Sequence, residues 1–293
     1  IPNFFLFPGS VRFILRFADS SRAEARPVEL SRRLEVAPPD VLLLPPNGGS
    51  VKQIICMKWG TYYTADYVNR LYNMIARYTT PPFRLCCLTN EPEGINPAVE
   101  IRPCPVLDLP PRMKNGGWRK VSLWSKEVAD LAGEWLYLDL DIIITGSLDD
   151  LFTYQGQSDY MVMRNYTTMD RRIGNTSVFR FKVGSHPDVL ERLLSSPQAM
   201  RDTYSNSQTF ISNTIKSMDF WPDGWIKQFK VHCLHPWPLR LFLQPRQYKD
   251  AKIVVCTGHP TPEELASGTW EAPWYKKIYK TLPPVKWVRD AWR

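Results

Sequence analysis

The sequence predicts an α/β protein with a mixed, mostly parallel β-sheet and helices on both faces. Short apolar runs of strand length, rich in Val, Ile and Cys, alternate along the chain with segments of helical periodicity. Strands that alternate with helices are typical of a parallel sheet covered on both sides. With 293 residues, 44% of them hydrophobic, the chain is long enough to bury a sizeable core.

The first half of the predicted domain contains three strands and one helix. A periodic helical face predicts a helix over 64–78, because its apolar residues recur every three or four positions. The predicted strands are VKQIICMKW (51–59), FRLCCLTN (83–90) and the short VEIRPCP (99–105).

The next predicted helix precedes the most apolar strand of the chain. Val121, Trp124, Val128 and Leu131 share one helical face, and Gly133 would cap the helix at its C-terminus. WLYLDLDIII (135–144) then predicts a central strand, and Ser147 is a suitable N-cap for a short helix after it. Further strands are expected at 159–164, 177–181 and 252–256, and further helices near 187–195 and 207–218.

Composition divides the chain into three parts. Residues 1–50 are rich in Pro and Arg and end in a Pro/Gly/Ser segment, which predicts a poorly ordered extension. Residues 51–275 carry the alternating strands and helices of the folded domain. Residues 276–293 form a basic and aromatic C-terminal tail, for which we weigh contact with an anionic membrane against packing on its own domain.

Charge and cysteine content narrow the function further. The net charge of +8 favours an anionic partner, such as a phosphate-bearing substrate or an acidic membrane face. No zinc-finger spacing or RNA-binding aromatic pattern occurs, so no nucleic acid is expected. The six cysteines show no C-x-x-C pair, and most lie in apolar runs, which indicates buried free thiols in a reducing compartment.

Asp139 and Asp141 interrupt the central apolar run. In a continuous strand, alternate residues point to the same side, so the two carboxylates would lie about 7 Å apart on one face. Like charges in an apolar setting are unfavourable unless a cation joins them, and oxygen ligands suit Mg²⁺ or Mn²⁺. The simpler alternative is that the strand ends at Leu138 and the aspartates begin a solvated loop. The apolar residues 142–144 after the pair argue against it.

The stretch YLDLDIIITGSLDDLF resembles the central motif of GT-A glycosyltransferases, especially the family-8 type that includes glycogenin and bacterial lipo-oligosaccharide galactosyltransferases. The resemblance covers 51–275 and implies a GT-A, Rossmann-like nucleotide-diphospho-sugar transferase fold. It implies that Asp139 faces the donor ribose or sugar and that Asp139 and Asp141 hold Mn²⁺ or Mg²⁺ against the diphosphate of a nucleotide sugar.

The same resemblance assigns donor-binding residues earlier in the chain. Trp59, Gly60 and Thr61, at the end of the first strand, would lie against the base and ribose. Asn90, at the end of the second strand, would read the base edge. A basic residue, Arg119 or Lys120, would lie close to the donor phosphates, where Gly116 and Gly117 allow a ligand to approach.

Later segments complete the expected site. GNTSVFRF (174–181) resembles the family segment in which an Asn lines the sugar pocket, here Asn175. NSQTF (206–210) resembles the family's D-Q region, with Gln208 beneath the anomeric carbon and Ser207 where the family has Asp. VVCTGHPTPEEL (254–265) resembles the C-terminal metal-binding segment, with His259 as a third metal ligand. The family's order of Gly and His is not reproduced there, and its Lys is absent.

The sequence thus predicts a metal-dependent hexosyltransferase. Whether the sugar is transferred with inversion or retention depends on the residues near the acceptor. An inverting enzyme needs a carboxylate base, for which Asp219 and Asp223 are the candidates. A retaining enzyme would use front-face attack with Gln208 nearby, and the resemblance favours retention with a UDP-linked donor.

The residues also allow two other hypotheses about the function. Ser207 and the irregular His259 segment allow a catalytically impaired nucleotide- or glycan-binding protein of the same fold. A haloacid-dehalogenase-like phosphatase also uses an apolar strand with D-x-D, but on the first strand of its domain. The acceptor would be a glycan, a lipid-linked sugar or a protein. The expected location is cytoplasmic, with the inner face of the membrane as an alternative.

Overall fold

The computed structural model describes residues 50–114, 116–169 and 171–293, apart from the side chain of Ile278. The extension predicted over 1–50 therefore lies outside the described residues except for its last one. In chain order the elements are β1 Lys52–Lys58, α1 Ala65–Tyr78, β2 Phe83–Thr89, β3 Glu100–Arg102, α2 Pro111–Lys114, η1 Gly117–Trp124, β4 Glu134–Leu138, β5 Ile142–Ile144, α3 Asp149–Thr153, β6 Tyr160–Arg164, β7 Gly174–Lys182, α4 Pro187–Ser195, α5 Pro197–Thr203, α6 Ser207–Thr214, β8 Asp219–Phe220, β9 Ile226–Gln228, η2 Phe229–Cys233, η3 Leu239–Leu241, β10 Ile253–Val255, α7 Pro262–Ser267, α8 Trp274–Lys280 and α9 Lys286–Ala291.

A seven-stranded sheet forms the centre of the domain, in the order β3-β2-β1-β4-β7-β6-β8. Strands β3, β2, β1 and β4 are mutually parallel, β7 runs antiparallel between β4 and β6, and β8 is parallel to β6. A smaller sheet, β5-β10-β9, lies beside it. The predicted mixed, mostly parallel sheet is confirmed.

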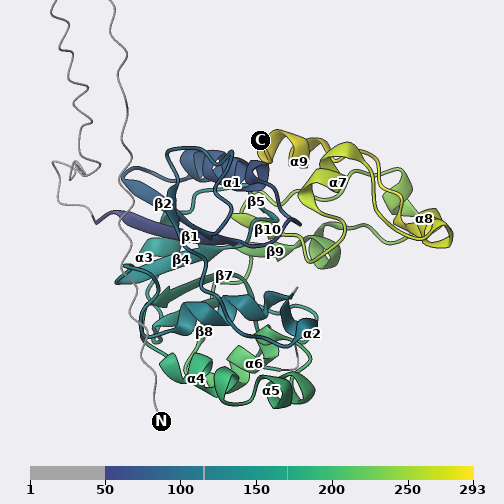
Figure 1. Ribbon diagram of the computed structural model, residues 1–293. Helices are drawn as coiled ribbons and strands as arrows, with labels where there is room; N and C mark the ends of the chain where they lie inside the picture. The colour runs from purple at the N-terminus through teal and green to yellow at the C-terminus, as the bar shows by residue number, and fades with distance from the viewer. Residues whose placement is uncertain (1–49, 115, 170) are drawn as a thin grey trace, which may run out of the picture. The chain divides into compact units, whose positions relative to one another are not determined.

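Both faces of the large sheet are buried because the middle positions of its central strands are apolar on both sides. Ile54 and Leu136 point into the core beneath α1 and the small sheet, whereas Ile55 and Tyr137 point into the core beneath η1 and α6. Figure 1 shows α1 and α9 over one face and α4, α5 and α6 over the other. The predicted helices on both faces are thus confirmed.

Several predicted elements differ in extent. The helix expected over residues 121–131 is a 3₁₀ helix that ends at Trp124, and Val128 instead forms an isolated bridge with Leu131. Gly133 does not cap it; its φ of +81° places it in the turn into β4. The helix expected over 207–218 ends at Thr214, and the short helix near Ser147 begins at Asp149.

The predicted central strand over 135–144 is two strands. β4 ends at Leu138 and belongs to the large sheet, while β5 begins at Ile142 and pairs with β10 in the small one. A strand that continued straight could not enter the second sheet, so the chain turns at 139–141. The simpler reading, that the strand ends at Leu138, was correct about the strand end, although apolar residues do follow.

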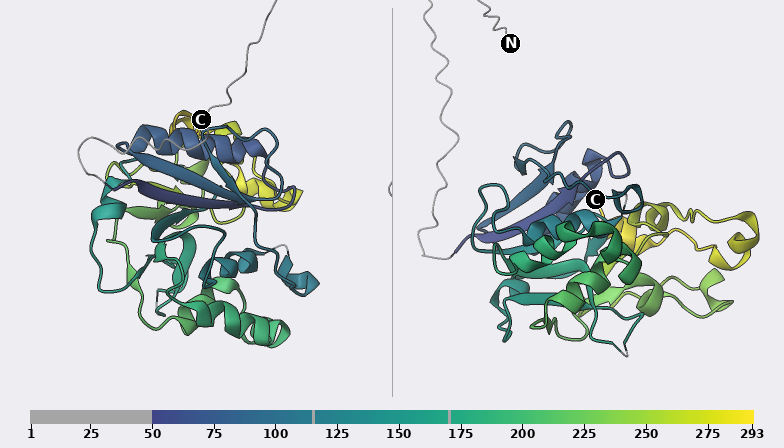
Figure 2. Two further views of the ribbon diagram at one scale, coloured as in Figure 1. Left: turned by 60° about the vertical axis from the view of Figure 1, so that its left-hand side comes forward. Right: turned by 60° about the horizontal axis from the view of Figure 1, so that its bottom comes forward.

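The C-terminal residues pack onto the domain. Val288 and Trp292 are buried, and the guanidinium of Arg70 on α1 lies 4.4 Å from the centroid of the Trp292 ring. Arg70 and Arg77 also donate hydrogen bonds to the last carbonyls of the chain, Arg70 Nη1 to Trp292 O at 3.1 Å and Arg77 Nη1 to Arg293 O at 2.9 Å. Of the tail predicted over 276–293, the last turn is therefore held against α1, as Figure 2 shows from two further directions.

All six cysteines are buried and free, as predicted. None of the helices described contains an apolar stretch long enough to cross a bilayer.

We predict that Trp292→Ala destabilises the domain by about 3 kcal/mol, because a buried indole is removed and a cavity remains. Trp274→Ala is the matched control: that indole is exposed, so its loss should change the free energy of unfolding by less than about 0.5 kcal/mol. Urea unfolding followed by circular dichroism measures both values. Equal midpoints for the two variants would contradict the packing of the C-terminus.

Candidate functional site

Asp139 and Asp141 lie in the turn that joins the two sheets. The backbone N–H of Asp139 donates to Ser177 O on β7 at 2.9 Å, and Cys256 N, after β10, donates to Asp141 O at 3.3 Å. The turn is therefore fixed on both sides by neighbouring strands. Both carboxylates line the same cavities, which agrees with the expectation that they point to one side.

Asp139 already has a cationic partner. Lys120 Nζ lies 2.5 Å from Asp139 Oδ1, and the hydroxyl of Tyr137 donates to the same oxygen at 2.9 Å. Both charged side chains are largely buried, with 10% of the Lys120 side chain and 16% of the Asp139 side chain exposed. Lys120 Nζ also donates to Thr176 O at 3.3 Å. Of the two basic residues proposed from the sequence, it is Lys120 that the fold brings to the carboxylates.

Asp141 lacks such a partner. Within residues 50–114, 116–169 and 171–293, no ion pair involves its carboxylate, although Tyr63 forms a hydrogen bond with it. Burial, followed by the negative charge of Asp139, raises the pKa of Asp141 to about 7, while Lys120 and the Tyr63 hydrogen bond act in the opposite direction. A carboxylate with this environment is one whose charge a bound cation would neutralise.

Two cavities meet at the aspartates. One, of about 300 Å³, has an aromatic wall made of Trp59, Tyr62 and Tyr63. The other, of about 390 Å³, has a polar wall that includes Asn175 and Gln208. Five residues line both cavities, which makes them two ends of one cleft: Gly116, Gly117, Lys120, Asp139 and Asp141.

The polar end of the cleft is shaped by α6 and η1. Gln208 Oε1 accepts a hydrogen bond from Thr176 N at 3.1 Å, which fixes the orientation of its amide. Asn206 caps α6 by accepting from Thr209 N at 2.9 Å. Ser207 is buried, and a Cβ atom at Gly117 would lie 3.1 Å from its Oγ. Ser207 therefore packs closely against η1, where Gly117 leaves room for its hydroxyl.

Some residues expected at the site lie elsewhere. Asn90 accepts a hydrogen bond from Cys104 N at 3.0 Å and holds a loop, and Arg119 lies beside Cys104.

The two predicted catalytic bases also lie away from the cleft. Asp219 Oδ2 accepts backbone hydrogen bonds from Gln157 and Ser158 and so closes a turn. Asp223 is exposed, with its carboxylate 3.9 Å from Arg164. None of these four predicted residues lines either part of the cleft, and neither do Gly60 and Thr61, which follow Trp59 in the same turn.

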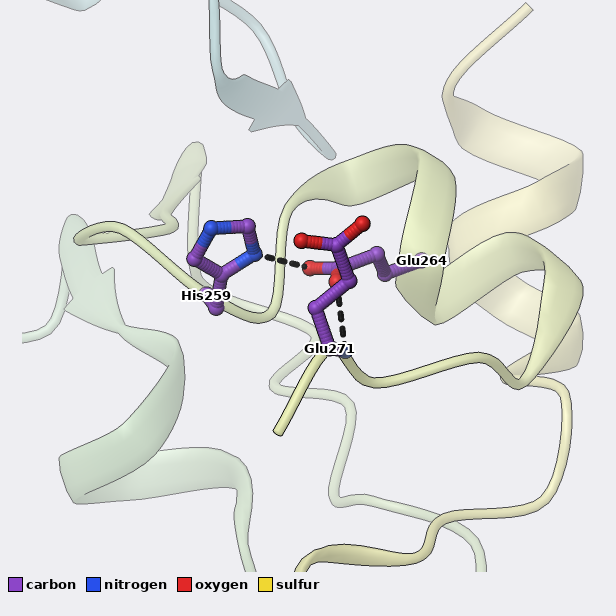
Figure 3. A group of neighbouring side chains, drawn as sticks. All are labelled: His259, Glu264 and Glu271. Carbon is purple, nitrogen blue, oxygen red and sulfur yellow. Dashed lines mark hydrogen bonds and ion pairs between the residues drawn. The ribbon is translucent and has the colours of Figure 1, made fainter. Parts of the chain in front are cut away.

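His259 lies next to the cleft rather than on its aspartates. Its neighbour Gly258 lines the polar end, while His259 itself lines an adjoining cavity of about 460 Å³ together with Glu271. Figure 3 shows the imidazole pointing to Glu264, with Nδ1 at 2.9 Å from Oε2. The nitrogen and carboxylate oxygens of His259, Glu264 and Glu271 lie within 4.8 Å of one another.

Glu264 is held by several donors at once. Its Oε2 accepts from Thr261 N at 2.7 Å in a capping box at the start of α7, and its Oε1 accepts from Glu271 N at 2.7 Å. Burial alone would raise the pKa of Glu264, but the backbone hydrogen bonds from Glu271 and Thr261, together with His259, outweigh it and lower the pKa. Glu264 therefore stays ionised beside the imidazole.

Sequence reasoning missed several residues of the cleft. Tyr62 and Tyr63 follow Trp59 after only two residues, and an aromatic cluster at a strand end was a usable sign of a planar ligand. Arg112 and Arg201 also line the polar end, but they come from α2 and α5 and share no local pattern with the aspartates. Only the tertiary fold brings them together.

No protein-family profile and no curated protein sequence matches this chain. Solved structures do resemble it. The galactosyltransferase LgtC, crystallised with donor and acceptor sugar analogues, superposes with a TM-score of 0.52 at 13% identity, over 77% of this chain and 99% of LgtC. The chain has the GT-A fold. An active-site variant of LgtC, in which a glutamine is replaced by glutamate, gives a TM-score of 0.50 at 14% identity over the same shares of the two chains.

The GT-A fold confirms the fold that the resemblance of YLDLDIIITGSLDDLF implied. It also sets aside a haloacid-dehalogenase-like phosphatase, since β4 is the fourth strand in chain order and lies in the middle of the sheet. At this low identity the likeness concerns the fold, and the chemistry of the cleft has to be argued from its own residues.

We predict that Asp141→Asn stabilises the metal-free protein in a pH-dependent way. The folded-state pKa of about 7 lies above the ordinary value of 3.8, so the ionised carboxylate opposes folding and stability is lost as the pH rises from about 4 to about 7. The variant should therefore gain on the order of 2 kcal/mol at pH 8 and almost nothing at pH 4. Chemical unfolding in a chelator measures the gain.

The exposed Asp223→Asn is the matched control, and its stability relative to the unmodified protein should not vary across this pH range. A gain for Asp141→Asn that is equal at pH 4 and pH 8 would contradict the assignment of the raised pKa to this carboxylate.

Proposed function

We propose that the protein is a metal-dependent glycosyltransferase that moves a hexose from a nucleotide diphosphate sugar, UDP-linked, to an acceptor hydroxyl. The observation that carries the proposal is the arrangement of the cleft: an aromatic end and a polar end meet at two carboxylates and a buried lysine, within the GT-A fold. An aromatic wall suits a nucleobase, charged groups suit a diphosphate, and polar side chains suit a sugar.

The residues of the metal site fit a divalent cation. Asp141 is a largely buried carboxylate that forms no ion pair with any described residue, and Asp139 keeps free acceptor capacity beside Lys120. Oxygen ligands of this kind suit Mn²⁺ or Mg²⁺. We propose Asp139, Asp141 and His259 as the ligands. When bound, the cation would stabilise the charge that develops on the leaving diphosphate.

The chain's own residues would do the rest of the work. Trp59 and Tyr62 would hold the base, and Lys120 would place a positive charge against the diphosphate. Because Gln208 Oε1 is taken by Thr176 N, its amide N–H groups remain for the donor sugar. Asn175 lines the same end of the cleft.

We propose that transfer proceeds with retention of configuration. Neither Asp219 nor Asp223, the candidates for an inverting base, lines the cleft, because the first closes a turn and the second is exposed. Gln208 does line it. A glutamine is also the altered active-site residue in the LgtC variant of the same fold, which supports a place for Gln208 in the site.

Glu264 would position His259. The hydrogen bond to Nδ1 fixes the tautomer in which Nε2 carries the free lone pair, as is usual for metal-binding histidines. The imidazole could then turn Nε2 toward the cleft that its neighbour Gly258 already lines.

Free buried thiols support a cytoplasmic location. The acceptor would be a glycan, a lipid-linked sugar or a protein. A binding protein of the same fold without turnover is the second candidate, favoured by Ser207 in place of the expected Asp.

The first test is calorimetric titration of UDP, GDP and CDP with and without Mn²⁺. We expect UDP to bind only when Mn²⁺ is present. Asp141→Asn should weaken this binding by about 100-fold, because the variant lacks the carboxylate proposed to bind the metal. Asp223→Asn should bind UDP normally. Absence of nucleotide binding under every condition would overturn the proposal, whereas binding without sugar transfer or donor hydrolysis would favour the second candidate.

The role of Glu264 has its own test. Glu264→Gln retains the capping box but removes the negative charge beside the imidazole, so Mn²⁺ affinity in the presence of UDP should fall about tenfold. Electron paramagnetic resonance of free Mn²⁺ measures it without catalysis. Glu263→Gln, one residue away and bonded to Tyr67, is the matched control. Unchanged Mn²⁺ affinity in Glu264→Gln would show that Glu264 acts only as a helix cap.

A further inference from the structure

Large apolar side chains that face solvent gather in two short segments. Of the thirteen that are exposed among the described residues, seven lie within 237–243 and 274–279, which is far more than an even distribution would place there. They are Trp237, Leu239, Phe242, Leu243, Trp274, Tyr275 and Tyr279. Phe242 and Trp274 are 80% and 79% exposed. Exposed apolar residues concentrated in this way mark an interaction surface.

The two segments lie side by side. Figure 1 and the right-hand view of Figure 2 both place η3, within the first segment, next to α8 at the end of the domain farthest from β2. The first segment is fixed at its base, where Gln244 Nε2 donates to Pro284 O at 3.2 Å and Trp287 Nε1 donates to Pro245 O at 3.0 Å. We call the exposed apolar residues of 237–243 and 274–279 the apolar end surface.

Cations surround these apolar side chains. Arg240, Lys276 and Lys277 belong to the same segments, and Lys280 directly follows the second one. The stretches WPLRLFL (237–243) and WYKKIYK (274–280) contain no Asp or Glu. In the described part of the chain, none of the four forms an ion pair with a carboxylate. Lys276 Nζ lies 5.7 Å from the Tyr275 ring centroid, and Lys280 Nζ lies 5.3 Å from that of Trp270. These cations remain available to an anionic partner.

We propose that the apolar end surface binds an anionic lipid bilayer. Trp and Tyr favour the boundary between headgroups and acyl chains, and each Lys or Arg at an anionic membrane contributes about 1 kcal/mol. The side chains of Phe242 and Leu243 would enter the acyl region. A second copy of the chain would fit less well, because it would bring cations against cations on both partners.

The position of this surface bears on the acceptor. The cavity that His259 lines is also lined by Pro273 and Lys277, at the start of α8. The N-terminal end of α8 therefore borders the loop that contains Gly258, and Gly258 lines the cleft. A bilayer on the apolar end surface would lie on the side of the cleft where this loop runs. If the proposed transfer is correct, the acceptor is therefore one that the membrane carries, a lipid-linked sugar.

The test is sedimentation of the full 293-residue chain with vesicles of phosphatidylcholine, with or without phosphatidylglycerol. We expect partitioning to be at least about tenfold stronger on the anionic vesicles. Phe242→Ser with Trp274→Ser should weaken it by about tenfold or more, and Lys276→Gln with Lys280→Gln by about 30-fold on anionic vesicles alone. All four side chains are solvent-exposed or partly so, and thermal unfolding should confirm that the variants fold.

Leu194→Ser is the matched control, because Leu194 is an exposed leucine on α4. Its partitioning should equal that of the unmodified chain. The proposal is overturned if the full chain does not bind anionic vesicles, or if binding survives the Phe242 and Trp274 substitutions. It is also overturned if sedimentation velocity shows a dimer that these substitutions dissociate. No nucleotide or metal is used, so the result is separate from that of the nucleotide titration.

Discussion

The ion pair between Lys120 and Asp139 makes the centre of this molecule possible. Two carboxylates two residues apart, in a turn between buried strands, would repel one another at a considerable cost in folding free energy. Lys120 neutralises one of the two charges, because its ammonium group lies 2.5 Å from Asp139. Tyr137 donates a further hydrogen bond to Asp139, and Thr176 O accepts one from Lys120. The charge of Asp141 is not neutralised in this way, and the pKa of Asp141 is raised to about 7. The fold thus keeps one carboxylate satisfied and one dependent on a ligand.

This arrangement requires the chain to leave one sheet and enter another. β4 pairs with β1 and β7, β5 pairs with β10, and the three residues between them are fixed by Ser177 on one side and Cys256 on the other. Residues that follow three different strands therefore meet at one place: the aspartates after β4, Trp59 after β1 and Gly258 after β10. Ligands of open α/β sheets bind at such carboxyl ends, where the strand order changes direction.

The parts of the fold that depend on local pattern could be predicted from the sequence. Apolar runs identified β1, β2 and β6, and helical periodicity identified α1 and α4, because each of these elements is buried in a way that its own residues reveal. The break in the central strand could not be predicted in this way. Ile142 is as apolar as Leu138, and only the pairing of β5 with β10, more than one hundred residues later, shows that they belong to different sheets.

The same distinction explains which site residues were found. Asp139 and Asp141 stand out because carboxylates are unexpected in an apolar run, and Lys120 could be narrowed to one of two neighbours. The choice between Lys120 and Arg119 depends on the direction in which a 3₁₀ helix presents them, and the sequence had suggested an α-helix. Asp219 is a candidate catalytic base from the sequence alone. In the structure its carboxylate accepts hydrogen bonds from two backbone N–H groups of a loop about sixty residues earlier.

Glu264 connects the chemistry of the cleft with the exposed end of the domain. One of its oxygens holds the His259 imidazole and the other holds the backbone of Glu271, three residues before α8 begins. Because the capping box at Thr261 fixes the carboxylate itself, the histidine and the start of α8 are positioned from a single rigid point. Any partner that rests on α8 is thereby held at a constant distance from the loop that lines the cleft. A surface tethered by a flexible linker would not provide this, since it would let the acceptor and the donor site move independently.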